Sequence, residues 1–173
     1  MARETMSTLI STVRNLIQDT TELTDNNVQD ALDRYAQRIL RHKLTATHTN
    51  PADGLYYWFQ AHAGHWENRN GALAIQDSEG TALALSESDL TYGLWKLATG
   101  TTNKTVYLVD GYTYDVYSAA VECLRILIAK IKDEYTFSSD EGSFQRDSRI
   151  RHLGELINQY RGAIRPYVLQ VAE

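Results

Sequence analysis

The sequence predicts a mainly α-helical protein: a helical bundle of about four helices, with a small antiparallel β-sheet inserted between helices 2 and 3. Apolar residues recur at helical spacing near both ends of the 173-residue chain. That spacing disappears in the middle, where short alternating segments are separated by turn signals. We therefore expect the bundle over residues 1–50 and 113–166, a β insertion over 55–112, and a C-terminal tail over 167–173.

The first half of the bundle is predicted from two amphipathic segments. In "STLISTVRNLIQD", Ser7 is a candidate N-cap, because its hydroxyl can accept a backbone N–H bond. The apolar residues at helical spacing there are Leu9, Val13, Leu16 and Ile17. "TDNNVQDALDRYAQRILRHKL" predicts a second helix with Thr24 or Asp25 as its N-cap. Its apolar stripe is Val28, Leu32, Tyr35 and Ile39. Pro51 and Gly54 mark its end.

The middle of the chain predicts about five short strands. In "NGALAIQDSEGTALAL", Leu73 and Ile75 can match Leu83 and Leu85 across a turn at 78–80. Asn70-Gly71 and Asp110-Gly111 are further turn signals. "YGLWKLA" and "KTVYLVDGYTYDVY" have the composition of further strands.

Two helices are predicted after the sheet. "DVYSAAVECLRILIAKIKDEYTF" has a wide apolar face, typical of the central helix of a bundle. That face consists of Val116, Ala120, Cys123, Leu127 and Ile131, broadened by Leu124 and Ile128. The last helix lies in "EGSFQRDSRIRHLGELINQYRGAIRP" and has a narrow seam, because its apolar residues are three and four apart. The seam residues are Ile150, Leu153, Ile157, Tyr160 and Ile164.

Composition and charge exclude several classes of protein. No apolar run approaches the length of a membrane span, and "MARETMSTLI" lacks the apolar region of a secretion signal. A single cysteine excludes an internal disulfide framework. The net charge of −5 is uneven: residues 51–120 carry eight acids and three bases, and residues 143–173 carry three acids and five arginines. This distribution argues against a general nucleic-acid binder and allows the C-terminal segment to dock on an acidic partner.

Candidates for chemistry are weak. His62, His65 and Glu67 have ligand-type side chains, but a zinc site needs a fourth partner, and we expect no metal and no cofactor. Cys123 falls on the apolar face of a helix and is predicted to be a core residue. The paired carboxylates Glu87 and Asp89 are interpreted as a solvated loop or cap.

Aromatic residues gather where the insertion begins and ends. The two clusters are Tyr56, Tyr57, Trp58 and Phe59, and Tyr112, Tyr114 and Tyr117. Aromatic rings could stack on bases or sugars. We favour a structural role in attaching the sheet to the bundle, because buried aromatic rings dominate packing energetics.

Arginines form one flank of the last helix. On a helical wheel Arg151, Arg161 and Arg165 lie together beside the apolar seam. The apolar tail that follows Pro166 includes Tyr167 and Val168. A solvated face and a frayed end would explain this pattern. A docking edge would also explain it, because guanidinium groups bind carboxylates and an apolar tail can insert into a partner.

The order of the predicted elements and five phrases along the chain form a pattern. The phrases are "TLISTVRNLI", "LTDNNVQDALDRYAQRI", "WENRNGALAIQDSEGTAL", "YDVYSAAVECLRILIAK" and "EYTFSSDEGSFQRDSRIRHLGELINQYR". In this pattern, which spans nearly the whole chain, the protein resembles the head–tail connector, or adaptor, proteins of tailed bacteriophages.

The resemblance implies a structural virion protein without catalytic activity. Such a subunit binds the portal protein, assembles into a ring of twelve copies, extends the DNA channel and forms the platform for the next neck or tail component. The implied location is the neck of the virion, after synthesis in the host cytoplasm. DNA would pass without sequence-specific binding, and no membrane is involved. The residues expected to contact the portal are Arg151, Arg161, Arg165, Tyr167 and Val168.

Three alternatives stay open on sequence grounds. The chain could be another neck protein, such as a stopper or tail-completion protein, whose partner is a different ring. It could be a module that binds nucleic acid or carbohydrate through the aromatic residues of the insertion. An enzyme has the weakest support and would need a metal at His62 and His65.

Overall fold

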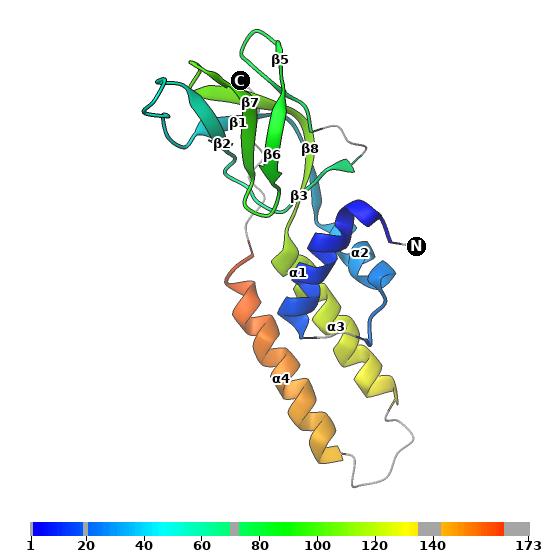
Figure 1. The fold of residues 1–173 in the computed structure, drawn as a ribbon. Coiled ribbons are helices and arrows are strands. Elements are labelled where there is room, and N and C mark those ends of the chain that lie inside the picture. The colour runs from blue at the N-terminus through cyan, green and yellow to red at the C-terminus, as the bar shows by residue number, and fades with distance from the viewer. Residues whose placement is uncertain (1, 19–20, 70–72, 135–142, 165–173) are drawn as a thin grey trace. The chain divides into compact units, whose positions relative to one another are not determined.

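The computed structural model describes residues 2–18, 21–69, 73–134 and 143–164. They divide into two compact units (Figure 1). The helical unit combines residues 1–35 with residues 115–173, and the β unit is the continuous segment 36–114.

The helical unit is built around α3 (Val116–Glu134). A short 3-10 helix, η1 (Glu4–Met6), leads into α1 (Ser7–Ile17), and α2 (Asp25–Arg34) follows. Both α1 and α2 contact α3, and α4 (Ser143–Arg161) runs beside it (Figure 1). The apolar face predicted for α3 is confirmed at every position but Ile128, which is half-buried. The other predicted residues are all buried: Val116, Ala120, Cys123, Leu124, Leu127 and Ile131.

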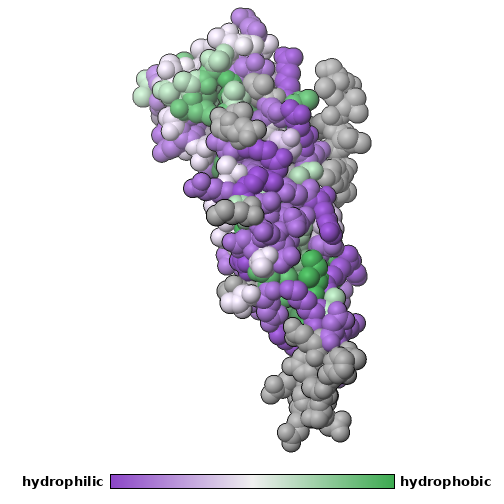
Figure 2. Space-filling model, turned by 90° about the vertical axis from the view of Figure 1, so that its right-hand side faces the viewer, coloured by the Kyte–Doolittle hydropathy of each residue, from purple (hydrophilic) through white to green (hydrophobic). Residues whose placement is uncertain are grey.

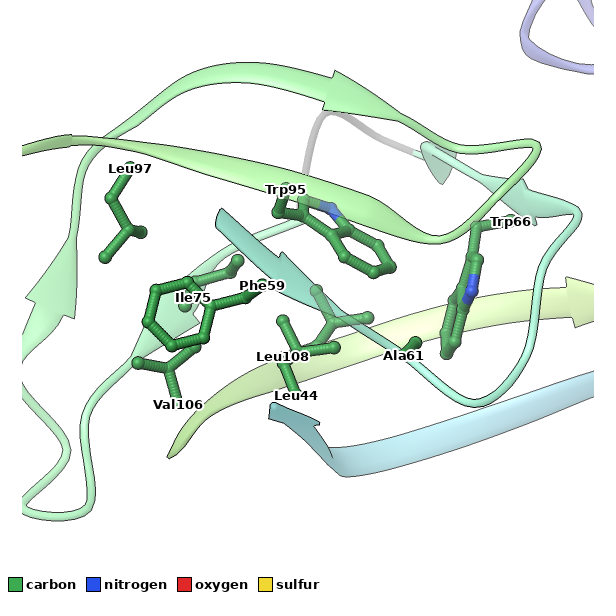
Figure 3. Packing of buried hydrophobic residues seen from close by; sticks show 9 residues of the cluster. All are labelled: Leu44, Phe59, Ala61, Trp66, Ile75, Trp95, Leu97, Val106 and Leu108. Carbon is green, nitrogen blue, oxygen red and sulfur yellow. The ribbon is translucent and has the colours of Figure 1, made fainter. Parts of the chain in front are cut away.

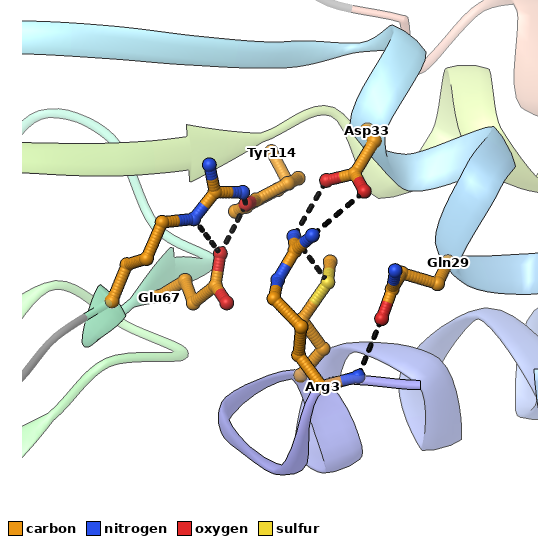
Figure 4. Close-up of polar contacts among 7 residues, drawn as sticks. Arg3, Gln29, Asp33, Glu67 and Tyr114 are labelled. Carbon is orange, nitrogen blue, oxygen red and sulfur yellow. Dashed lines mark hydrogen bonds and ion pairs between the residues drawn. The ribbon is translucent and has the colours of Figure 1, made fainter. Parts of the chain in front are cut away.

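Polar contacts fix the N-terminal segment of the helical unit (Figure 4). The guanidinium of Arg3 donates to both carboxylate oxygens of Asp33, over 2.9 and 2.6 Å. The backbone N–H of Arg3 donates to the side-chain oxygen of Gln29 over 2.6 Å. These bonds hold the chain ahead of α1 against α2 in a defined position.

The β unit contains eight strands in the described part of the chain, arranged in one antiparallel sheet. The strand order is β5-β4-β8-β1-β2-β7-β6, and β3 also pairs with β8. The strands are β1 (Ala36–Ala46), β2 (Tyr56–Gln60), β3 (Trp66–Glu67), β4 (Ile75–Gln76), β5 (Ala82–Leu83), β6 (Leu85–Asp89), β7 (Leu94–Thr101) and β8 (Thr105–Tyr114).

The two ends of the strand order meet, so that the sheet forms a nearly closed barrel. Only Ala84 separates β5 from β6. On one side β5 pairs with β4, and on the other side β6 pairs with β7. The backbone N–H of Ala98 donates to the carbonyl of Ala84 over 2.8 Å and continues the pairing through the junction.

The barrel interior is filled by apolar side chains from nearly every strand (Figure 3). The indole rings of Trp66 and Trp95 meet edge to face with centroids 5.7 Å apart, a favourable geometry for aromatic pairs. The cluster is Leu44, Phe59, Ala61, Trp66, Ile75, Trp95, Leu97, Val106 and Leu108. This interior is a hydrophobic core separate from that of the helical unit.

The predicted fold class is therefore wrong. The protein is not a mainly α bundle with a small sheet insertion, because the β unit is a large barrel-like sheet with its own core. The largest error is in the second helix, which was expected to include Tyr35 and Ile39. The helix ends at Arg34, and the following residues form the eleven-residue strand β1.

Turn predictions had mixed outcomes. The hairpin across residues 78–80 is confirmed for Ile75, which pairs with Leu83, and Gln76 pairs with Ala82. Leu85, which was also expected in this hairpin, belongs to β6 and pairs with Leu97. Asp110-Gly111 is not a turn and lies within β8. Asn70-Gly71 lies outside the described residues.

Candidate functional site

The first candidate site is the exposed flank of α4. The seam side of this helix faces the bundle, with Leu153 and Ile157 buried and Ile150 and Tyr160 half-buried. The predicted seam residue Ile164 is also half-buried but lies beyond the end of α4 at Arg161. Leu156, which the narrow seam did not include, is also buried. The arginines Arg151 and Arg161 are exposed along one flank of this seam. Arg165, Tyr167 and Val168 lie outside the described residues, so their role stays a prediction.

Several polar contacts tie α4 to α1 and to the segment that follows α1. Arg149 forms an ion pair with Glu22. The hydroxyl of Tyr160 donates to the carbonyl of Leu16 over 2.8 Å, and its ring lies 5.9 Å from that of Tyr117. Burial raises the pKa of the Tyr160 hydroxyl, and the neighbouring Tyr117 raises it further. The tyrosine therefore stays a neutral donor and sets the position of the helix.

Arg151 and Arg161 differ from these structural residues. Neither forms an ion pair with any residue that the structure describes. They lie ten positions apart, or about 15 Å along a helix. Two exposed guanidinium groups on a helix held in place by buried seam residues can bind carboxylates of a partner.

The second candidate is the histidine-rich segment at the start of β3. Glu67 is fully buried and accepts hydrogen bonds from the Tyr114 hydroxyl and, over 3.2 Å, from Nε of Arg69 (Figure 4). Another guanidinium nitrogen of Arg69 donates to the Tyr114 hydroxyl over 2.8 Å. Glu67 therefore joins β3 to β8 instead of meeting His62, which is exposed. Among the described residues, no three histidine, cysteine or acidic side chains form a group able to hold a metal ion.

A hollow beside Tyr112 is the third candidate. Two guanidinium groups lie near the Tyr112 ring, with Arg69 4.1 Å and Arg38 6.0 Å from the ring centroid. Arg38 also forms a two-pronged ion pair with Asp110, over 2.6 and 3.0 Å. This pairing lowers the pKa of the Asp110 carboxyl. The lining residues are Arg38, Glu67, Arg69, Leu73, Asp110, Gly111 and Tyr112. Because each arginine here already has a carboxylate partner, the hollow presents little free charge to a ligand.

The residues of the first aromatic cluster belong to β2, and those of the second belong to β8 and α3. Phe59 is in the barrel core, whereas Tyr56, Tyr57 and Trp58 are half-buried. The side chain of Tyr114 is buried in the Glu67 cluster.

The remaining candidate residues are also explained by their burial or by their contacts within the fold. Cys123 is buried, as predicted. Glu87 and Asp89 are exposed, as interpreted, but they belong to strand β6 and not to a loop. Glu87 pairs with Lys96 over 3.1 Å. Asp89 accepts the backbone N–H bonds of Thr91 and Tyr92 at the turn into β7.

Comparison of the chain with protein-family models, curated proteins and solved structures finds no match. None of the helices within the described ranges is both long and apolar enough to cross a membrane.

Proposed function

We propose that this chain is a head–tail connector adaptor of a tailed bacteriophage. In this role it binds the portal protein as a ring, extends the DNA channel and forms the platform for the next neck or tail component. The role is structural and needs no catalytic group. The proposal rests on the resemblance in sequence, together with one feature of the helical unit.

That feature is the pair Arg151 and Arg161 on α4. Both are exposed, and neither is paired with a described residue. Leu153 and Ile157 of the same helix are buried, so the arginines beside them are held on a rigid element. Arginine forms two-pronged bonds to carboxylates, which suits docking on an acidic surface of a portal ring. The apolar tail from Tyr167 would extend this contact.

The test is the native mass of the protein mixed with the portal ring of its own phage. We expect a complex with one copy for each portal subunit. The double variant Arg151→Glu/Arg161→Glu should bind at least about tenfold more weakly, because like charges then face each other. Arg125→Glu, an exposed arginine on α3, is the matched control and should leave binding unchanged.

A truncation after Arg165 tests the tail separately. We expect it to abolish portal binding while the helical content by circular dichroism is unchanged. Full binding by both the truncated chain and the Arg151→Glu/Arg161→Glu variant would show that α4 and the tail are not the portal contact. A well-folded protein that forms no complex with the portal would favour another neck position, such as a stopper or tail-completion protein.

A further inference from the structure

Three cations without acidic partners line one side of the barrel. Arg41 and Lys43 lie on β1, and Lys104 lies in the turn between β7 and β8. All three are exposed, and none forms an ion pair with a residue in the described part of the chain. The guanidinium of Arg41 lies 5.0 Å from the centroid of the Tyr107 ring on β8. We call these three residues the basic strip.

Three acids line another side of the same barrel. Glu79 lies in the turn between β4 and β5, and Glu87 and Asp89 lie on β6. All three are exposed, and the side chain of Glu87 is 61% exposed despite its contact with Lys96. We call these residues the acidic strip.

The strand order puts the two strips on opposite sides of the barrel. Going one way around, β2 and β7 separate β1 from β6, and going the other way β8 and β4 separate β1 from β5. A single copy therefore cannot bring its own strips together. A second copy can, because a contact between two different surfaces of identical subunits joins them head to tail.

We propose that the basic strip of one copy docks against the acidic strip of a second copy. The proposal goes beyond the portal contact assigned to α4, because it concerns the β unit and contacts between copies. Repetition of such a contact produces a ring when the rotation between copies closes, and a filament when it does not.

The surroundings of the strips favour recognition by charge. The face of the molecule shown in Figure 2 is mostly hydrophilic, with one hydrophobic area near the top and a second lower down. Large apolar side chains that are exposed within the described ranges are limited to Leu40 and Tyr92. Leu40 adjoins Arg41 and is 63% exposed, and the small apolar Ala82 and Ala84 are exposed on the side of the acidic strip. A modest apolar contact would thus be surrounded by complementary charges, which set the register of an interface.

The edge of β1 also leaves room for a second copy. In the part of β1 that precedes Thr45, one edge of the strand pairs with β8. No described strand pairs with the other edge there. Such an edge can accept a neighbouring chain unless charged side chains prevent it. Here Arg41 and Lys43 would repel another copy of β1 and would attract the acidic strip.

The experiment measures self-association of the full chain by sedimentation velocity, without portal. We expect oligomers at millimolar concentration and about 10 mM salt, where the Debye length is about 30 Å, and their loss at about 1 M salt, where it is about 3 Å. The variants Arg41→Glu/Lys43→Glu and Glu79→Lys/Glu87→Lys should each associate at least about tenfold more weakly. Arg125→Glu is again the control that should change nothing.

Mixing the two charge-reversed variants is the decisive step. The reversed basic strip of one variant now complements the reversed acidic strip of the other, and their unaltered strips also match. We therefore expect the equimolar mixture to associate like the wild type, which would also show that both variants are folded. A wild type that stays monomeric at low salt, or a mixture that stays monomeric, would overturn the proposal.

A covalent trap provides a second measurement. The variant Lys43→Cys/Glu87→Cys should form a ladder of disulfide-linked multimers under oxidising conditions. Each single variant should not, because its new thiol faces no partner thiol across a head-to-tail contact. A ladder that is absent from the double variant, or equally strong in a single variant, would contradict the contact. A full chain that self-associates but does not bind the portal would contradict the proposed function and leave this contact between copies intact.

Discussion

At the scale of single residues, His42 is the least satisfied polar group of the barrel. The residue is 5% exposed, and the centroid of its ring lies 5.3 Å from that of Trp66. Neither ring nitrogen has a hydrogen-bond partner among the described residues. Burial lowers the pKa of His42, and the nearby His62 lowers it further. The folded barrel therefore favours the neutral imidazole.

This arrangement predicts a loss of stability in mild acid. An unfolded chain takes up the His42 proton near pH 6.5, whereas the folded chain takes it up only at lower pH, so the free energy of unfolding falls as the pH drops below about 6.5. We expect the wild type to lose up to about 1.4 kcal/mol per pH unit relative to His42→Leu over this range. Urea unfolding of both proteins from about pH 7.5 to about pH 5 measures the difference. A difference that does not change with pH would show that His42 is protonated equally in both states.

Gly111 shows why one local signal was misread. An Asp-Gly pair predicts a hairpin turn, but Gly111 lies within β8. A Cβ atom at this position would come within 2.8 Å of the Trp66 ring and 2.9 Å of Leu108. The glycine therefore serves the approach of an indole ring from a residue 45 positions earlier. A contact over that distance along the chain leaves no local pattern in the sequence.

At the scale of elements, the sequence predicted the helices that bury an apolar face and failed at β1. Residues such as Ala36, Gln37 and Leu40 favour a helix locally, and Ile39 continues the stripe of α2. The segment is nevertheless a strand, because it pairs with β8 from Ala36–Tyr114 to Thr45–Thr105. Pairing with a distant strand overrides weak local propensity. The same pairing explains why the barrel was underestimated as a small insertion.

Helix starts allow a matched test at this scale. The Thr24 side chain accepts the N–H of Asn27, and the Asn27 side chain accepts the N–H of Thr24, so that both form a capping box at α2. Ser7 was also predicted as a cap, but η1 precedes it and α1 has no side-chain cap. Thr24→Ala should therefore cost about 1 kcal/mol, and Ser7→Ala should cost almost nothing. Equal losses in urea unfolding would contradict this assignment.

At the scale of the whole molecule, the β unit is inserted into the helical unit through two neighbouring connections. Ala36 pairs directly with Tyr114, so the ends of the insertion lie side by side. Just outside it, the N–H of Asp115 donates to the carbonyl of Tyr35 over 3.3 Å. The sequence predicted an insertion between the second and third helices, and it also predicted the arginine flank. The sequence could not show that the basic and acidic strips lie on opposite sides of the barrel, because their positions depend on the strand order.

The adjacent ends of the insertion lead to a prediction about separability. Replacing residues 36–114 with two glycines should leave the helical unit folded. The glycines need to span only the short gap between Tyr35 and Asp115, and the deletion removes no core residue of that unit. Circular dichroism should show a helical protein with a cooperative thermal transition. If the two proposals are both right, this shortened chain binds the portal through α4 but no longer self-associates, since it lacks both charged strips. A shortened chain that is unfolded would show that the helical unit needs the barrel for stability. A folded chain that self-associates as strongly as the wild type would move the contact between copies to the helices.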